Sequence, residues 1–172
     1  AWAEQRESQI DTIADALKSS RDEVEDKVRQ LVERLREQEK TVAQLKARMA
    51  SQAGTDLTAQ AEDINGVKVL TAKLDGADSK ALRDTMDQLK NKLGSAAIVL
   101  VSEDDGKVRV VAGVTKDKTS VIKAGELVNV AATEVGGKGG GRPDMAQAGG
   151  SQPENIDKAL QAAKLWLQEK LG

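Results

Sequence analysis

The first third of the chain repeats its apolar positions every seven residues. One series holds Ile10, Leu17, Val24, Leu31, Gln38 and Leu45, and a companion series holds Ala14, Arg21, Val28, Leu35, Val42 and Met49. Most positions between them are charged, so the pattern predicts helices with a narrow a/d seam as their only apolar face. The pattern weakens near residues 18–20, where Ser20 and Glu23 form a capping-box signature. We therefore expect two helices, at about 5–18 and 21–52.

A seam of this kind requires a partner helix, and the sequence leaves its identity open. The two helices can fold against each other as a hairpin, or the longer one can pair with a second copy in a homodimer. A third interpretation is an amphipathic extension that packs on a further domain. The chain begins inside the helical pattern without an initiating methionine, so we expect it to be part of a longer polypeptide.

Charge and heptad periodicity both stop at residues 51–55, which predicts a helical subdomain over 1–53 and a globular α/β subdomain over 54–172. In the second part, Asn65-Gly66 favours a type I′ turn between two short strands. The continuous apolar run 98–101 indicates a buried strand, and alternation over 108–114 indicates the strand that returns from it. Together they predict a central hairpin backed by helices.

Three helices are expected around this sheet. One follows Asp78, which can cap it, and ends at Gly94. Another spans roughly 119–135, weakened by Gly125. The last starts at a capping box of Ser151 and Glu154, with Trp166 packing beside an apolar face made of Ile156, Leu160, Ala163, Leu167 and Leu171. The predicted class is α+β: a coiled-coil-like helical extension, then a small α/β domain with a hairpin-containing sheet flanked by helices.

Composition narrows the chemistry. The 172 residues include no cysteine and no histidine, which excludes disulfides, thiol nucleophiles, imidazole bases and the common zinc-ligand sets. No carboxylate pair stands out from the charged background, so we expect no active site. No apolar run approaches the length of a membrane span. With no Phe or Tyr and only two Trp residues, a base-stacking platform is not expected, and nucleic-acid recognition would use backbone and shape.

Charge is unevenly distributed although the net charge is only −2. Residues 54–106 contain ten acidic and six basic residues, whereas residues 107–142 contain three acidic and seven basic ones. The second segment can therefore present a local positive field to a few phosphates. The alternative is a scatter of lysines that merely aid solubility. We take Lys116, Lys118 and Lys123 as an auxiliary basic surface.

The segment 136–150, GGKGGGRPDMAQAGG, holds seven of the fifteen glycines. Consecutive glycines can point successive backbone N–H groups into one concavity that binds anions. The candidate anion-binding loop consists of Gly137, Lys138, Gly139, Gly140, Gly141 and Arg142, with Asp144 and Gln147 ordering it from behind. Lys138 supplies a point charge and Arg142 a planar fork for phosphate oxygens. The alternatives are a flexible linker and a tight packing turn.

The same run closely resembles the glycine-rich motif of the C-terminal domain, C-Ala, of bacterial alanyl-tRNA synthetase. A related accessory domain occurs in DHH-family phosphoesterases, where the glycine run typically leads into a histidine. Arg142 stands at that place here, which favours the synthetase. The order of elements along the whole chain resembles that of the family, but only the glycine motif is specific to it.

The resemblance implies a cytoplasmic, non-catalytic domain that grips folded tRNA(Ala) where the D and T loops meet. Its partners would be the aminoacylation and editing domains of the same polypeptide, which it helps to couple on one tRNA, and its helices contribute to dimerisation in some family members. ATP and zinc would belong to those other domains. Two alternatives remain: a coiled-coil dimerisation module that binds no RNA, and the accessory nucleic-acid-binding half of a DHH-type phosphoesterase.

Overall fold

The computed structural model gives the backbone of all 172 residues and the side chains of all except residues 50, 51 and 53–55. It divides into two units, Ala1–Leu45 and Lys46–Gly172, which we call the helical unit and the globular unit. The subdomain boundary expected at 53/54 falls among residues whose side chains lie outside the described part, so that boundary stays a prediction.

Two helices joined near residue 20 confirm the expected start of the chain, but their ends differ. Helix α1 is Trp2–Ala16, the 3₁₀ turn η1 is Arg21–Glu23, and α2 is Val24–Thr58, instead of 5–18 and 21–52. The first helix stops early because Lys18 adopts a left-handed φ of +50°. As the capping signature predicted, the Glu23 carboxylate accepts hydrogen bonds from the Ser20 N–H and Oγ, at 3.4 and 3.0 Å.

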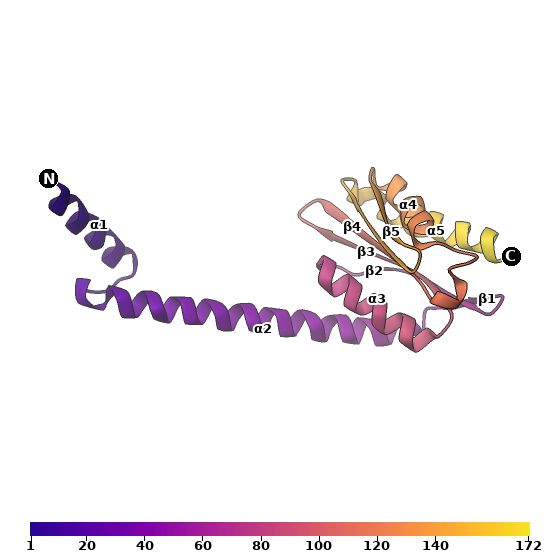
Figure 1. Ribbon diagram of the computed structural model, residues 1–172, viewed down its shortest axis with the longest axis horizontal. Coiled ribbons are helices and arrows are strands. Elements are labelled where there is room, and N and C mark those ends of the chain that lie inside the picture. The colour runs from indigo at the N-terminus through magenta and orange to yellow at the C-terminus, as the bar shows by residue number, and fades with distance from the viewer. The chain divides into compact units, whose positions relative to one another are not determined.

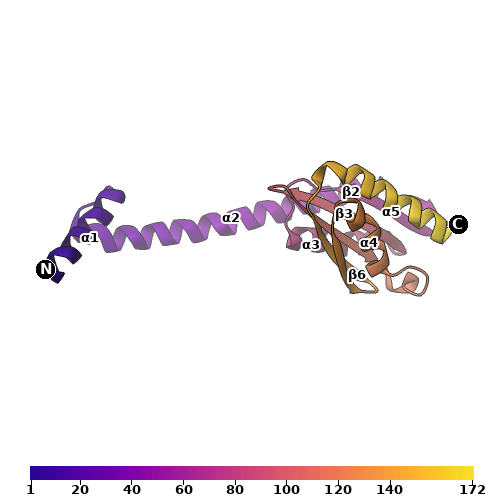
Figure 2. The same ribbon diagram turned by 90° about the horizontal axis from the view of Figure 1, so that it is seen from above.

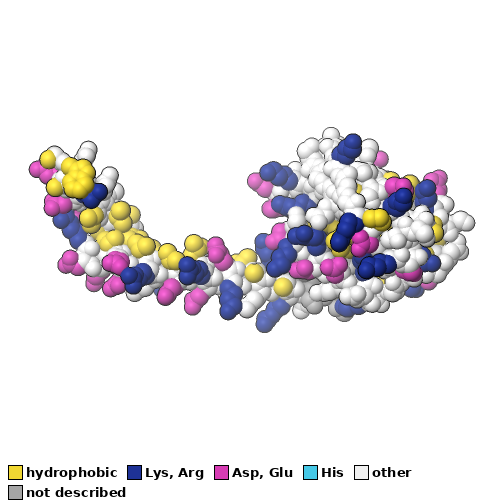
Figure 3. Space-filling model, viewed as in Figure 1, with side chains coloured by type: hydrophobic (Ala, Val, Ile, Leu, Met, Phe, Trp, Pro, Cys, Tyr) yellow, Lys and Arg dark blue, Asp and Glu magenta, His cyan; other side chains and the backbone are white. Residues whose placement is uncertain are grey.

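Most of the a/d seam of these helices is exposed, whereas Ala14 is buried and Leu17 and Val24 are half-buried. Leu35 and Leu45 are 56% and 52% accessible, and Ile10, Val28 and Leu31 are similarly open. Figure 3 shows apolar side chains in yellow on the surface of α1 and α2. The second helix runs six residues past its predicted end, and Leu57 in its last turn is buried in the core of the globular unit. Burial of a leucine side chain contributes about 1.5–3 kcal/mol, which favours the added turns.

The globular unit is built on one mixed sheet of six strands (Figure 1), which adds the pair at 138–150 to the two hairpins that were expected. The strands are β1 (Glu62–Ile64), β2 (Val67–Lys73), β3 (Ala96–Asp104), β4 (Lys107–Val114), β5 (Lys138–Arg142) and β6 (Met145–Gly150), in the spatial order β1-β2-β3-β4-β6-β5. Strands β2 and β3 are parallel, with Lys68 opposite Ala96, and helix α3 (Ser79–Leu93) connects them. The other neighbouring strands are antiparallel.

Both hairpin turns at the start of the sheet follow local sequence signals. Asn65 and Gly66 have φ values of +52° and +83°, as a type I′ turn requires, and Asp105 and Gly106 have +50° and +73°. The cap of α3 is also confirmed, since the Asp78 carboxylate accepts the N–H of Ala81 at 2.8 Å.

Helices cover both faces of the sheet, as the two views in Figures 1 and 2 show. On one face, α3 and Leu57 pack with Leu70, Ile98 and Leu100. On the other, α4 (Ala124–Glu134) and α5 (Ile156–Leu171) pack with Val99, Val110 and Ala146. The fold is therefore mixed α and β with a sheet flanked by helices, as predicted, and it has three layers. None of the described helices is long and apolar enough to span a membrane.

Two predicted helix starts were wrong. Residues 119–123 are not helical, because Lys123 is extended (φ −104°, ψ 131°) and the N–H of Ala124 bonds the carbonyl of Pro143; only the 3₁₀ turn η2 (Lys116–Lys118) precedes α4. The final helix begins with the 3₁₀ turn η3 (Pro153–Asn155), and Gln152 rather than Ser151 is its N-cap. The Ser151 capping box is therefore not formed, whereas Trp166 packs against the core as expected.

Candidate nucleic-acid interface

The glycine-rich segment 136–150 is an edge hairpin of the sheet, β5 and β6, and not a loop. Gly136 has a left-handed φ of +69°, but Gly139 and Gly140 continue an extended strand paired with Ala148 and Gln147. In a strand, successive N–H groups point in opposite directions, so the predicted concave nest does not form. The candidate residues instead lie along the outermost strand of the molecule's sheet.

Most of these glycines are required by close packing of backbones. An added Cβ would lie within 3.0 Å of neighbouring atoms at Gly137, Gly139, Gly141 and Gly150. At Gly137 the clash is with the carbonyl oxygen of Gly149, at 1.6 Å. A packing role, one of the alternatives read from the sequence, therefore accounts for these positions. Gly140 and Gly149 differ, since a Cβ there meets only open space or an ordinary contact of 3.8 Å among the described residues.

Helix α4 holds the hairpin through a side chain that the sequence analysis missed. The Asn129 Oδ1 accepts the N–H of Gly139 at 3.0 Å, and its Nδ2 donates to the carbonyl of Gly125 at 2.9 Å. The sequence signal was available, because Asn129 is a polar residue in the otherwise apolar run Leu127–Ala132. Asn129 thus satisfies a backbone donor on the outer edge of β5.

The two charged residues of β5 project to one face of the sheet. Side chains alternate along a strand, and Arg142 lies opposite Met145, which packs with the α3 side of the core. Lys138 and Gly140 share that parity, so all three face α3. Both charged side chains are exposed, Arg142 by 79%. The structure therefore brings Lys138 and Arg142 together on one face with Gly140 between them.

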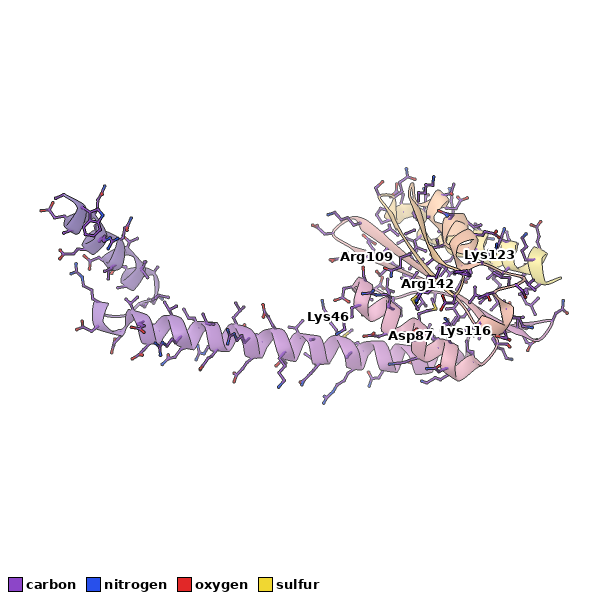
Figure 4. All side chains as sticks on the ribbon, in the orientation of Figure 1. Lys46, Asp87, Arg109, Lys116, Lys123 and Arg142 are labelled. Atoms are coloured by element: carbon purple, nitrogen blue, oxygen red, sulfur yellow. The ribbon has the colours of Figure 1, made fainter. Side chains whose placement is uncertain are left out.

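Two grooves flank this strand. The groove on the α3 side has a volume of about 540 Å³ and is lined by Arg83, Asp84 and Asp87 from α3 and by residues of the hairpin. The groove on the α4 side has a volume of about 660 Å³ and is lined by Lys123, Glu126 and Asn129 among others. Gly140 and Gly141 line both grooves. Arg142, Asp87 and Lys123 are labelled in Figure 4.

The turn of the hairpin is fastened to the sheet through Asp144. Its carbonyl accepts the N–H of Val114 at 3.0 Å and the Lys90 Nζ at 3.1 Å. Its carboxylate lies 3.5 Å from the Arg142 Nε. Gln147 lies in the ladder opposite Gly140 and lines the α3-side groove.

The auxiliary lysines come from the connection between β4 and α4. Lys123 precedes Ala124, whose N–H bonds Pro143 in the hairpin turn, so the fold brings Lys123 beside the glycine strand. Lys116 and Lys118 flank Asp117 in η2. The hydroxyl of Ser95 donates to Asp117, and this hydrogen bond, with a smaller contribution from Thr115, lowers the pKa of the Asp117 carboxyl. Asp117 is therefore firmly ionised at neutral pH and offsets part of the charge of the two lysines.

Comparison with known families gives this fold a name. The family model described as the DHHA1 domain matches residues 66–169, which include the sheet from β2 onward, the glycine hairpin and most of α5. The chain belongs to the DHHA1 domain family. This match confirms that the glycine hairpin is part of the accessory-domain fold expected from the motif.

Curated relatives are similar along almost the entire chain. The alanine–tRNA ligase of Nitrosococcus oceani is 50% identical over 171 residues, which is 99% of this chain and 20% of that protein. The alanine–tRNA ligase of Ralstonia nicotianae is 51% identical over 165 residues, 96% of this chain and 19% of that protein. The chain therefore spans about one fifth of the length of these relatives.

Solved structures share the fold. The C-Ala domain from Aquifex aeolicus alanyl-tRNA synthetase matches with a TM-score of 0.57 at 25% identity, over 64% of this chain and 96% of that domain. The exonuclease RecJ bound to manganese matches with a TM-score of 0.55 at 16% identity, over 86% of this chain and 34% of RecJ. The resemblance to C-Ala read from the motif is thereby confirmed, and RecJ shows the same fold.

Proposed function

We propose that this chain is a non-catalytic, tRNA-binding C-terminal module of a cytoplasmic alanyl-tRNA synthetase. Half-identity to alanine–tRNA ligases over nearly the whole chain carries this proposal. The module binds tRNA(Ala) and helps the aminoacylation and editing domains of the same polypeptide act on one tRNA. ATP and zinc serve those other domains, since this chain contains no cysteine or histidine to bind zinc.

The glycine hairpin is the proposed grip. Lys138 and Arg142 project from one face of an exposed edge strand, where a phosphate backbone can approach without crossing another element. Arginine binds phosphate oxygens with a planar fork and lysine binds them as a point charge. Lys123 lies beside the same strand, while Lys116 and Lys118 extend the basic surface less strongly because ionised Asp117 lies between them.

A salt titration tests this proposal. Fluorescent tRNA(Ala) is titrated with the chain and with a Lys138→Glu/Arg142→Glu variant at several salt concentrations. Each phosphate contact contributes about 0.7 to 0.9 to the slope of log K against log salt. We expect the variant to bind at least tenfold more weakly and with a slope lower by about 1 to 2.

A matched variant keeps the charge change and moves it away from the hairpin. Lys158→Glu/Lys170→Glu alters two exposed lysines of α5, and we expect it to keep most of the affinity. Thermal unfolding of all three proteins checks that they are folded. Equal binding by the parent and the hairpin variant would remove the hairpin from the interface, and absence of binding by the parent would refute the tRNA-binding function.

We also propose that the exposed seam of the helical unit pairs two copies of the chain. The observation that favours this is the row of a/d side chains, among them Val28, Leu31 and Leu35, left 42–56% accessible. Pairing two such rows would bury them in knobs-into-holes contacts. Sedimentation equilibrium of the chain and of a Leu31→Lys/Leu35→Lys variant tests the idea. We expect the parent to be a dimer and the substitutions to convert it to a monomer. A parent that stays monomeric over a roughly 100-fold range of protein concentration would contradict the proposal.

A further inference from the structure

Gly140 is a glycine that the packing of the chain does not require. Among the described residues, no atom lies within 4 Å of the position a Cβ would take, and its φ is not left-handed. Its neighbours differ, since a Cβ would lie 2.1 Å from the Gln147 carbonyl oxygen at Gly139 and 2.6 Å from that of Met145 at Gly141. Glycine in a strand costs about 0.5–1 kcal/mol relative to alanine. At position 140, no packing contact among the described residues offsets this loss of stability.

The two grooves beside β5 meet at this residue. Gly140 and Gly141 line the α3-side groove and the α4-side groove alike. With no side chain at position 140, the two grooves are separated only by the backbone of the edge strand. A side chain there would project to the α3 face, between Lys138 and Arg142, and would stand in the path from one groove to the other.

Charged groups are arranged around that crossing point. Lys138 and Arg142 lie two residues to either side of Gly140, so their Cα atoms are about 13 Å apart. On the α4 side the groove carries Lys123 and Glu126. On the α3 side it carries Arg83, Arg142 and three carboxylates, which are those of Asp84, Asp87 and Asp144, and the Asp144 carboxylate lies 3.5 Å from the Arg142 Nε. Lys138 and Arg142 therefore supply the positive charge at the strand itself, while Asp84 and Asp87 on the α3 wall of the groove can accept hydrogen bonds from hydroxyl and amino groups.

We infer that a ribonucleic-acid strand crosses β5 at Gly140, at a steep angle to the strand, with a phosphate over Gly140 between Lys138 and Arg142. The sugar and base side of the strand then lies toward the α3-side groove, whose carboxylates accept hydrogen bonds from 2′-hydroxyls. This inference rests on the proposed tRNA-binding function and specifies its point of contact.

Glycine substitutions test the inference without changing any charge. Binding of fluorescent tRNA(Ala) is measured for the parent, Gly140→Ala, Gly140→Leu and the control Gly149→Ala. Gly149 lies on β6 opposite Lys138, two residues along the ladder from the crossing, and a Cβ there makes an ordinary 3.8 Å contact with the Val108 carbonyl oxygen. We expect Kd to rise severalfold for Gly140→Ala and more than tenfold for Gly140→Leu, and to stay within twofold for Gly149→Ala.

The outcomes separate the two proposals. Thermal unfolding should show Gly140→Ala and Gly140→Leu at least as stable as the parent, because position 140 is open and glycine is replaced. As a second measurement on the unaltered chain, the backbone amide signals of Gly140 and Gly141 should shift on addition of tRNA(Ala). Parent-like binding by folded Gly140→Leu would overturn the crossing point and leave tRNA binding intact. A parent that does not bind would overturn both.

Discussion

At the scale of single residues, Asn129 decides how the glycine strand is held. Its amide accepts from Gly139 and donates to Gly125, so one side chain satisfies backbone groups on both the strand and the helix. The outer edge of a sheet otherwise leaves such groups unpaired. Asn129 was detectable in the sequence only as a polar interruption of an apolar run, because its two partners are brought to it by the fold.

Replacement of Asn129 by alanine should destabilise the globular unit by about 1–3 kcal/mol, since it removes two hydrogen bonds and leaves the half-buried N–H of Gly139 unpaired. Urea unfolding measures the change. Asn129→Asp is the matched control: it can still accept from Gly139 but cannot donate to Gly125, so we expect an intermediate loss. An Asn129→Ala protein as stable as the parent would show that water replaces both bonds.

At the scale of elements, the helix α3 joins two parallel strands and depends on its N-cap. The Asp78 carboxylate accepts the Ala81 N–H at 2.8 Å and lies 3.5 Å from the Lys46 Nζ. The hydrogen bond from Ala81 is the main cause that lowers the pKa of Asp78, with Lys46 contributing. The cap was predictable because Ala81, the hydrogen-bond donor to Asp78, lies only three residues away in the sequence.

The contribution of this cap to the free energy of unfolding should depend on pH. Because the folded-state pKa of Asp78 is lowered, its stabilising effect is fully present above the unfolded value of about 3.9 and is lost as pH falls through the folded value. We expect Asp78→Ala to cost about 1 kcal/mol at pH 7 and the difference from the parent to shrink below about pH 4. Urea unfolding from pH 7 to pH 2.5 measures it. Asp78→Ser keeps a neutral cap, so protonation of residue 78 cannot reduce the stability of this variant in acid. If the stability difference between Asp78→Ala and the parent did not change with pH, the argument would be contradicted.

The glycine segment 136–150 is the part of the sheet whose strands were not predicted from the sequence. Glycine has a low strand propensity, and the sequence around it offered a loop, a linker or a turn. The strands form because β6 pairs with β4, Gln147 opposite Val111 and Ala146 opposite Ala112, and these partners lie more than thirty residues away. Local sequence carries no record of a pairing at that distance.

At the scale of the whole molecule, the stability of the globular unit should be independent of the helical unit. Ala14 is the one residue of Ala1–Leu45 among the buried apolar residues of the described part. We expect deletion of residues 1–45 to leave Tm within about 4 °C of the parent, equivalent to less than about 1 kcal/mol. Differential scanning calorimetry measures it.

Deletion of residues 1–58 is the matched comparison. It also removes Leu57, which is 7% accessible and packs in the core on the α3 side. Loss of a buried leucine costs about 2–5 kcal/mol, so this shorter chain should melt well below the first one. Equal Tm values for the two deletions would show that the last turns of α2 contribute nothing to the globular unit.

The sequence by itself determined the features that depend on near neighbours. These are the heptad helices, the two turns with left-handed residues, the cap of α3 and the apolar strands, together with a motif long enough to indicate its family. Tertiary structure decided the features that need distant partners: the ends of the helices, the six-strand order and the conversion of the glycine run into an edge hairpin. It also decided that Lys138 and Arg142 share a face, because side-chain direction in a strand follows from pairing and register.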